Sequence, residues 1–310
     1  MSTPLSRRDM LRTAAAGAAA LILPGMVAAR ARGGPAARTA DPDLERLLAW
    51  TAVLRNGGLA RAASPIGASA ARVGELAAGT PYEPSTLEAY LRAGGSRSSQ
   101  EPLTLSLTRF DCVTLVESCL AVARVAGNRD TPTWERFGGE IERMRYRGGA
   151  RRGYTSRLHY FSEWIADGAT RGLVRDLGPE LGGVEDRRPL RFMTRHRASY
   201  PAFADEQVYR EIGTIERRLD GRPRRVIPTA RIPEVSGRIE SGDVLAFATA
   251  IPGLDVTHTA FAYRDAAGVL RVLHAPLSGG VVAITRATLP EYVAAIRRAT
   301  GVLVARPLRG

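Results

Sequence analysis

Both cysteines of this 310-residue chain lie in one stretch, LTRFDCVTLVESCLAVARVAG, at positions 112 and 119. Apolar residues after Asp111 recur at helical spacing as far as Gly127, so the stretch predicts a helix. On a helix, a separation of seven positions places the Cα atoms of the two cysteines roughly 10 Å apart, whereas a disulfide needs them within about 7 Å. Cys112 would lie at the helix start, where the helix dipole favours a thiolate. The pattern therefore predicts that Cys112 is a candidate nucleophile and that Cys119, two turns further along, is a buried thiol.

A thiolate nucleophile needs a base, and the chain has four histidines: His159, His196, His258 and His274. The last two lie in DVTHTAFAYRDAAGVLRVLHAP, which predicts two antiparallel strands joined by a turn at residues 265–268. Because both positions are even-numbered, a register with an even pairing sum places the two imidazoles on one face, about 5 to 8 Å apart. Two unrelated histidines, or a metal site with no fourth ligand at a usual spacing, are the alternatives.

The rest of the chain predicts helices first and strands afterwards. Expected helices cover residues 41–53, 68–78, 133–146, 157–166, 205–219 and 290–299. Expected strands cover residues 101–110, 243–248, 256–264, 269–274, 281–284 and 302–306. Residues 183–240 show little regular pattern outside the helix near 205–219. This order favours an α+β fold over a doubly wound one.

Four short motifs resemble, in order, those of the NlpC-type papain-like cysteine hydrolases. That superfamily has a DC helix start, a GD strand, an H-[TV]-[GA] strand and an HA strand, and this chain has FDCVTLVE, SGDVLAFA, THTAF and LHAPLSGGVVAI. The chain is also similar to the N-acetylmuramoyl-L-alanine amidase-like branch, long described as a domain of unknown function. The shared segments are GTPYEPSTLE, FDCVTLVES, RYRGGARRGYTSRLHYFSEWI, FMTRHRASYPAF and PGLDVTHTAFAY. Together they run from about residue 79 to residue 284.

This resemblance implies both a fold and a mechanism. The fold would be a papain-like core, a nucleophile helix packed on an antiparallel sheet, with an N-terminal helical extension and branch-specific insertions. Cys112 would be the nucleophile, His258 the general base and then acid, and His274 the orienting third member. Tyr82 in GTPY matches the position of an active-site tyrosine, and we expect it to support the oxyanion with the backbone N–H of Cys112. No metal and no organic cofactor would be required.

The resemblance also suggests a substrate. The related endopeptidases that cut after γ-D-glutamate have DCSG, whereas Val113 and Thr114 follow the cysteine here, as in the amidase-like branch. We therefore expect cleavage between the muramoyl lactyl group and L-alanine in peptidoglycan fragments. Residues expected to contact the substrate are Asp111, Ser156, Arg157, His159 and Tyr160. Asp111 could instead be structural, and His159 and Tyr160 could pack on the core.

Two other functions stay open on the sequence alone. One is a γ-D-glutamyl-diamino-acid endopeptidase of the same fold. The other is an exported envelope-binding protein whose catalytic group is dormant.

The N-terminus predicts export. Residues 1–31 combine paired arginines, Arg7 and Arg8, with an Ala-rich apolar run, which resembles a twin-arginine export signal. Residues 32–41 read as a linker and 42–310 as one catalytic domain, with a helical part (42–182), an irregular insertion (183–240) and a sheet part (241–310). We expect a periplasmic or cell-envelope protein with no stable membrane insertion.

The composition is strongly basic. The formal net charge is +13, and all 44 basic residues are arginine. The arginines are scattered without a basic stripe or a stacking motif, which argues against a nucleic-acid binder. Attraction to an anionic envelope polymer is the expected consequence. We expect the protein to act as a monomer on muramoyl-peptides.

Overall fold

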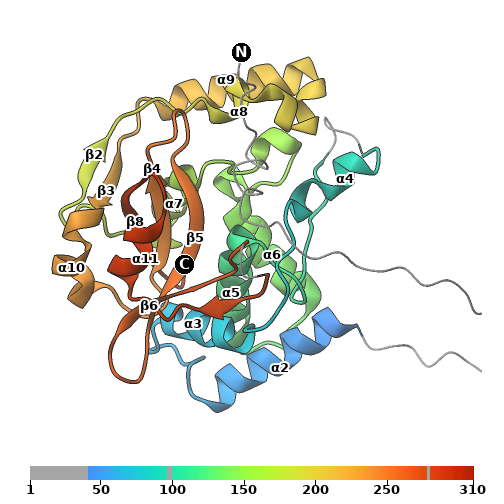
Figure 1. Ribbon diagram of the computed structural model, residues 1–310. Coiled ribbons are helices and arrows are strands. Elements are labelled where there is room, and N and C mark those ends of the chain that lie inside the picture. The colour runs from blue at the N-terminus through green and yellow to red at the C-terminus, as the bar shows by residue number, and fades with distance from the viewer. Residues whose placement is uncertain (1–40, 96–99, 278–279) are drawn as a thin grey trace, which may run out of the picture.

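The computed structural model describes residues 41–95, 100–277 and 280–310 (Figure 1). Its helices are α2 (Pro42–Asn56), α3 (Ile66–Leu76), α4 (Ala89–Arg92), α5 (Cys112–Gly127), α6 (Trp134–Arg145), α7 (Phe161–Thr170), α8 (Phe192–Arg195), α9 (Glu206–Leu219), α10 (Ile232–Val235) and α11 (Leu289–Ala295). Its strands are β1 (Val174–Asp176), β2 (Val184–Asp186), β3 (Arg224–Pro228), β4 (Val244–Thr249), β5 (Val256–Arg264), β6 (Leu270–His274), β7 (Ala283–Ile284) and β8 (Ala299–Pro307). The predicted export signal, and the predicted linker up to residue 40, lie outside the described residues.

Eight strands of the described chain form one antiparallel sheet, so the fold is a mixture of helices and antiparallel sheet, as predicted. The strand order is β2-β3-β8-β4-β5-β6-β7, and β1 pairs with β8 beside this path. The predicted strands from residue 243 onward are all present, within a few residues at their ends. The last strand in the sequence, β8, lies between β3 and β4, which makes it a central strand.

Apolar side chains cover both faces of this sheet. Helices α3 and α5 pack on one face, against Ala246, Phe261 and Leu273. Helices α10 and α11 pack on the other face, against Phe247 and Ala260. Figure 1 shows α2 and α3 below the strands and α8 and α9 across the top of the view, where a third apolar cluster lies. Within the described ranges, no helix is long and apolar enough to cross a bilayer.

Helix starts follow the cap signals in the sequence. The side chain of Asp41 accepts a hydrogen bond from the backbone N–H of Asp43 at the start of α2, and Thr133 accepts one from Arg136 at the start of α6. Helix α7 begins at Phe161 rather than near residue 157. Arg157 is extended because it forms a β-bridge with the residue that follows α6.

The alternating segment 101–110 is predicted to be a strand, and this prediction is wrong. The segment is irregular because side chains of α2 bind its backbone polar groups. The carboxylate of Asp43 accepts from the backbone N–H of Leu107 at 2.6 Å, and Arg46 donates to the Leu107 carbonyl oxygen at 2.9 Å. Polar backbone satisfied in this way needs no neighbouring strand.

Residues 183–240 contain more regular structure than the sequence predicts. The expected helix is present as α9, but the range also supplies β2 and β3, and β3 pairs with the central strand β8. The expectation of an irregular insertion is therefore wrong for these two strands. Only Val226 and Ile227 in β3 are apolar and buried, and arginines precede them, so the strand pattern is too short to recognise.

The GD motif at the start of β4 joins three elements. Gly242 has a φ of +86°, and a side chain there would collide with the backbone of Gly67 in α3. The carboxylate of Asp243 accepts from the backbone N–H of Glu240 and pairs with Arg306 of β8, both at 2.8 Å. The motif therefore fixes α3 against the start of β4 and ties β4 to β8, and Asp243 caps the turn before β4.

A buried ion pair holds α5 in place. Arg145 of α6 donates to the carboxylate of Glu117 at 2.7 Å, and the two side chains are only 3% and 1% exposed. Burial raises the pKa of Glu117, and the guanidinium opposes that effect. Arg145 also donates to a carbonyl of the irregular segment, so α5, α6 and that segment are linked.

Candidate active site

Cys112 is the first residue of α5, and its position is set by the residue before it. Asp111 is the N-cap: its carboxylate accepts from the backbone N–H of Thr114, and the Thr114 hydroxyl accepts from the N–H of Asp111, each at 2.8 Å. Cys112 is partly exposed and Cys119 is fully buried, with no disulfide at either. Burial raises the pKa of the Cys119 thiol, which keeps that thiol protonated.

The segment that carries Tyr82 runs beside the residues just before Cys112. Tyr82 forms a parallel β-bridge with Phe110. Phe110 donates from its N–H to the carbonyl of Pro81 at 3.1 Å and accepts from the N–H of Glu83 at 2.9 Å. Tyr82 is half-buried against the main core. This pairing explains why the GTPY segment accompanies the start of α5.

The two histidines lie side by side, as the alternation predicts. Phe261 pairs with Leu273, so His274 lies opposite Ala260 and His258 lies one diagonal step away on the same face. The ring nitrogens His258 Nε2 and His274 Nδ1 are 2.9 Å apart, and the ring centroids are 5.1 Å apart. The β4–β5 register shifts just after His258 pairs with Phe247, and β-bulges of this kind redirect side chains.

A hydrogen bond ties the start of α5 to β5 next to His258. The Thr259 hydroxyl donates to the carbonyl oxygen of Cys112 at 2.9 Å. Because side chains alternate along a strand, Thr259 lies on the face covered by α5, and His258 lies with Ala260 on the face covered by α11. The contact therefore fixes the first turn of α5 at the end of β5 that bears the imidazole.

Two aromatic residues that the sequence analysis missed surround the histidines. The Tyr292 hydroxyl of α11 is 3.1 Å from His274 Nδ1, and the Phe247 ring stacks on His258 with centroids 5.7 Å apart. Burial, and then the charge of the Cys112 thiolate, raise the pKa of Tyr292. Cys112 thus lies within electrostatic reach of the hydroxyl that contacts His274. No local motif marks Tyr292, since it belongs to an ordinary Pro-initiated helix.

Burial sets the charge state of both rings. It lowers the pKa of His258 to about 3, with a smaller contribution from His274, and lowers the pKa of His274 to about 4. Both rings are therefore neutral at pH 7. If His258 Nε2 donates to a neutral His274, the Nδ1 lone pair of His258 can accept a thiol proton. In the described part of the chain, no three His, Cys, Asp or Glu side chains are grouped to hold a metal ion.

Acidification should destabilise the wild-type protein more than the His274→Gln variant. Histidine in the unfolded chain has a pKa of about 6.5. Below that pH the unfolded chain therefore binds protons that the two rings do not bind in the folded protein. The stability contributed by His274 is present above pH 6.5 and is lost progressively toward pH 4. At pH 4.5 the loss is about 2 to 3 kcal/mol. Urea unfolding at pH 7.5, 6.0 and 4.5 measures it, and equal pH slopes in the two proteins would contradict it.

Two of the predicted substrate-contacting residues are buried with partners from the chain itself. Arg157 is 6% exposed and pairs with Glu88 at 3.3 Å and Glu101 at 3.4 Å. The Tyr160 hydroxyl donates to the carboxylate of Glu216 at 2.6 Å, in the cluster between α8 and α9. These contacts give Arg157 and Tyr160 supporting roles in the scaffold.

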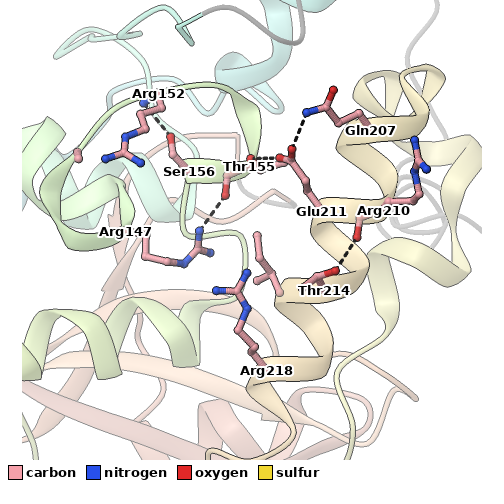
Figure 2. Close-up of a pocket in the computed structure, with 11 residues that line it drawn as sticks. Arg147, Arg152, Thr155, Ser156, Gln207, Arg210, Glu211, Thr214 and Arg218 are labelled. Carbon is pink, nitrogen blue, oxygen red and sulfur yellow. Dashed lines mark hydrogen bonds between the residues drawn. The ribbon is translucent and has the colours of Figure 1, made fainter.

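The other two residues of this segment are nearer to solvent. His159 Nε2 is 2.9 Å from the carbonyl of Tyr154, and the two rings pack at a centroid distance of 4.5 Å. The Ser156 hydroxyl donates to the carbonyl of Gly153, the residue just before the turn η3 (Tyr154–Ser156), and accepts from the N–H of Arg152. Ser156 also lines a cavity of about 470 Å³ between this turn and α9 (Figure 2).

The chain is similar in sequence and in fold to known amidase-like proteins. The family model described as N-acetylmuramoyl-L-alanine amidase-like matches residues 72–301. A crystal structure of an N-acetylmuramoyl-L-alanine amidase from Bacteroides uniformis is 28% identical with a TM-score of 0.70, over 78% of this chain and 99% of that chain. A structure described as a putative xylanase from Bacteroides fragilis is 30% identical with a TM-score of 0.68, over 76% and 99%.

A more distant structure shares the fold of this chain. A Legionella pneumophila protein described by a domain of unknown function is 17% identical with a TM-score of 0.61, over 85% of this chain and 94% of that chain. At that identity it shows the fold alone. A search of curated proteins gave no match.

Proposed function

This chain belongs to the N-acetylmuramoyl-L-alanine amidase-like family, and on that premise we propose that it is a metal-independent cysteine hydrolase. Its proposed reaction is cleavage of the amide between the muramoyl lactyl group and L-alanine in peptidoglycan fragments. The observation that carries the proposal is the position of Cys112. It begins α5 and is tied through its carbonyl to β5, next to the hydrogen-bonded pair of His258 and His274.

In the proposed first half-reaction, Cys112 Sγ attacks the amide carbonyl carbon while its proton moves to His258 Nδ1. The C–N bond then breaks, and His258 returns the proton to the departing amine of L-alanine. A thioester between the lactyl acyl group and Cys112 remains. The charge on His258 is stabilised because its Nε2–H donates to the neutral His274.

The second half-reaction consumes one water molecule. His258 removes a proton from the water, whose oxygen attacks the thioester carbonyl carbon. The C–S bond breaks, the lactyl carboxylate leaves, and Cys112 recovers its proton. Both tetrahedral intermediates carry an oxyanion, and the N–H of Cys112 points out of the N-terminal end of α5, the end of a helix that stabilises negative charge. Tyr82 is the proposed second donor.

The proposal extends to substrate binding, compartment and fold type. Ser156 and His159 are the proposed contacts for sugar and stem peptide, and Asp111 acts mainly as the cap that positions Cys112. Residues 1–31 are the proposed twin-arginine-type export signal, which would place the enzyme in the periplasm or cell envelope. The packing of α5 on an antiparallel sheet supports a papain-like core.

Mass spectrometry of muropeptides digested by the purified protein tests the reaction. The amidase should release peptides that begin with L-alanine and leave a muramoyl sugar with its lactyl carboxylate. Products that retain muramoyl-L-Ala-D-Glu would contradict the amidase activity and indicate the endopeptidase activity instead. Because one similar structure is described as a putative xylanase, xylan belongs in the same assay, and release of reducing sugar from it would contradict the proposal.

Removing the Tyr292 hydroxyl should slow turnover without weakening substrate binding. Tyr292→Phe keeps the ring that packs on Phe247 and His274 but removes the contact with His274 Nδ1. We expect kcat to fall about fivefold, because one hydrogen bond contributes about 1 kcal/mol to orientation, while KM changes less than about twofold. Tyr209→Phe is the control, because this partly buried tyrosine of α9 packs on Phe203 in a different apolar cluster. An unchanged kcat for Tyr292→Phe would exclude a positioning role.

A further inference from the structure

The cavity beside Ser156 is lined by arginines and lies apart from the cysteine. We call it the arginine pocket and define it by Arg147, Arg152, Arg210 and Arg218, together with Glu211. Figure 2 shows the guanidinium groups of Arg147 and Arg218 near one another between η3 and α9, with Arg152 beside Ser156 and Arg210 on α9. Cys112, His258 and His274 are not among its lining residues.

The arginine pocket has an excess of positive charge. The fork of Arg147 is neutralised by Glu163, with contacts of 2.7 and 2.9 Å. Arg152, Arg210 and Arg218 make no ion pair with a carboxylate in the part of the chain that the structure describes.

One acidic side chain offsets part of that excess. Glu211 is the carboxylate of the pocket, and its oxygens accept from the Thr155 hydroxyl at 2.7 Å and the Gln207 amide at 3.0 Å. Three guanidiniums against one carboxylate leave a charge of +2 (3 − 1 = 2).

We propose that the arginine pocket binds a phosphate monoester. Such a group carries about −1.5 to −2 charges at pH 7, which matches the excess, and its oxygens accept the paired N–H groups of guanidinium forks. A single carboxylate would leave part of the charge uncompensated. The volume of about 470 Å³ is that of a small-molecule site. A free sugar phosphate and the phosphorylated end of an envelope polymer offer the same chemistry.

This site goes beyond the proposed hydrolase activity. Ser156 lines the same pocket, so a bound phosphate would lie next to the surface proposed for the muramoyl-peptide. The phosphate site does not depend on that proposal, because binding is measured without turnover. Cys112→Ala should therefore bind phosphate as tightly as the wild-type protein, even if the amidase assignment fails.

Calorimetric titration of the full chain tests the ligand chemistry. Glucose 6-phosphate should bind saturably with one site, glucose should not bind, and glucose 6-sulfate, with one charge fewer, should bind at least about threefold more weakly. A phosphate-terminated glycerol phosphate oligomer separates the two sources: tighter binding than glucose 6-phosphate indicates a polymer end, and weaker or equal binding a free sugar phosphate. No saturable binding, or a sulfate ester that binds as tightly, would overturn the proposal.

Substitutions within the arginine pocket test the location. The double variant Arg152→Gln/Arg218→Gln should weaken glucose 6-phosphate binding at least about tenfold, since each charged hydrogen bond contributes about 1.5 to 3 kcal/mol. Arg129→Gln/Arg286→Gln removes two exposed arginines elsewhere and should change the affinity less than about twofold. Equal weakening in both variants would mean non-specific attraction to a basic protein.

Removing the negative charge of Glu211 tests whether weaker binding in the arginine variants could result from misfolding. Glu211→Gln keeps the shape and one acceptor of the side chain but raises the pocket charge by one unit. The affinity for glucose 6-phosphate should increase about threefold. A damaged fold would not tighten binding, so weaker binding by this variant would contradict the site.

Discussion

Alanine in place of Cys112 should lower kcat/KM for muramoyl-peptide hydrolysis by roughly 10⁴-fold or more. The proposed reaction passes through a thioester on this sulfur, and the other cysteine of the helix, Cys119, is fully buried. Nucleophile removal in enzymes of this kind leaves only the rate enhancement due to binding and oxyanion stabilisation. Release of peptides that begin with L-alanine, followed by mass spectrometry, measures the loss.

The second cysteine provides a matched control on the same helix. Cys119 is fully buried in the main core, and Cys119→Ala should cost about 1 kcal/mol of stability while retaining most activity. Iodoacetamide should alkylate Cys112 in the wild-type protein and stop turnover. Equal loss of activity in the two variants would mean that α5 matters as packing and that Cys112 is not the nucleophile.

Replacing His258 with alanine should lower kcat about 10³-fold and change KM only slightly. The imidazole acts as base and then acid in the proposed steps, and such proton transfers contribute roughly 10² to 10⁴ in rate. The ring is partly buried, neutral at pH 7 and hydrogen-bonded to His274, so we expect it to stabilise the transition state more than the bound substrate.

The alkylation rate of Cys112 gives a second readout for His258. Without the imidazole, the thiol should react with iodoacetamide several-fold more slowly at pH 7, because less thiolate forms. His196→Gln is the control, since the contacts of the His196 ring are with the carbonyl and the ring of Phe192 in α8. A His258→Ala variant with unchanged kcat would leave the proposal without a base.

Local signals predicted the central parts of the candidate site. An aspartate before an apolar helical pattern placed Cys112 at a helix start, because an N-cap works within three residues of sequence. The alternation of β5 and β6 placed His258 and His274 on one face, because a strand has a period of two. The same kind of signal gave the α+β order of elements.

Contacts between segments that lie far apart in the chain could not be predicted from the sequence. The irregular course of residues 101–110 depends on Asp43 and Arg46, which lie about sixty positions away. Tyr292 reaches His274 only because α11 covers the β6 face, and no motif marks that packing. Arg157 was expected to contact the substrate because the sequence pattern does not show that its guanidinium already pairs with Glu88 and Glu101.

The central place of β8 has a consequence for how the protein is made. This strand follows the other seven in the sequence and pairs with β1, β3 and β4, so the sheet cannot close until residues 299–307 have left the ribosome. Pairings between such distant segments slow folding. A product that ends before residue 299 would expose the edges of β3 and β4 to aggregation, and it should be insoluble with no residual activity.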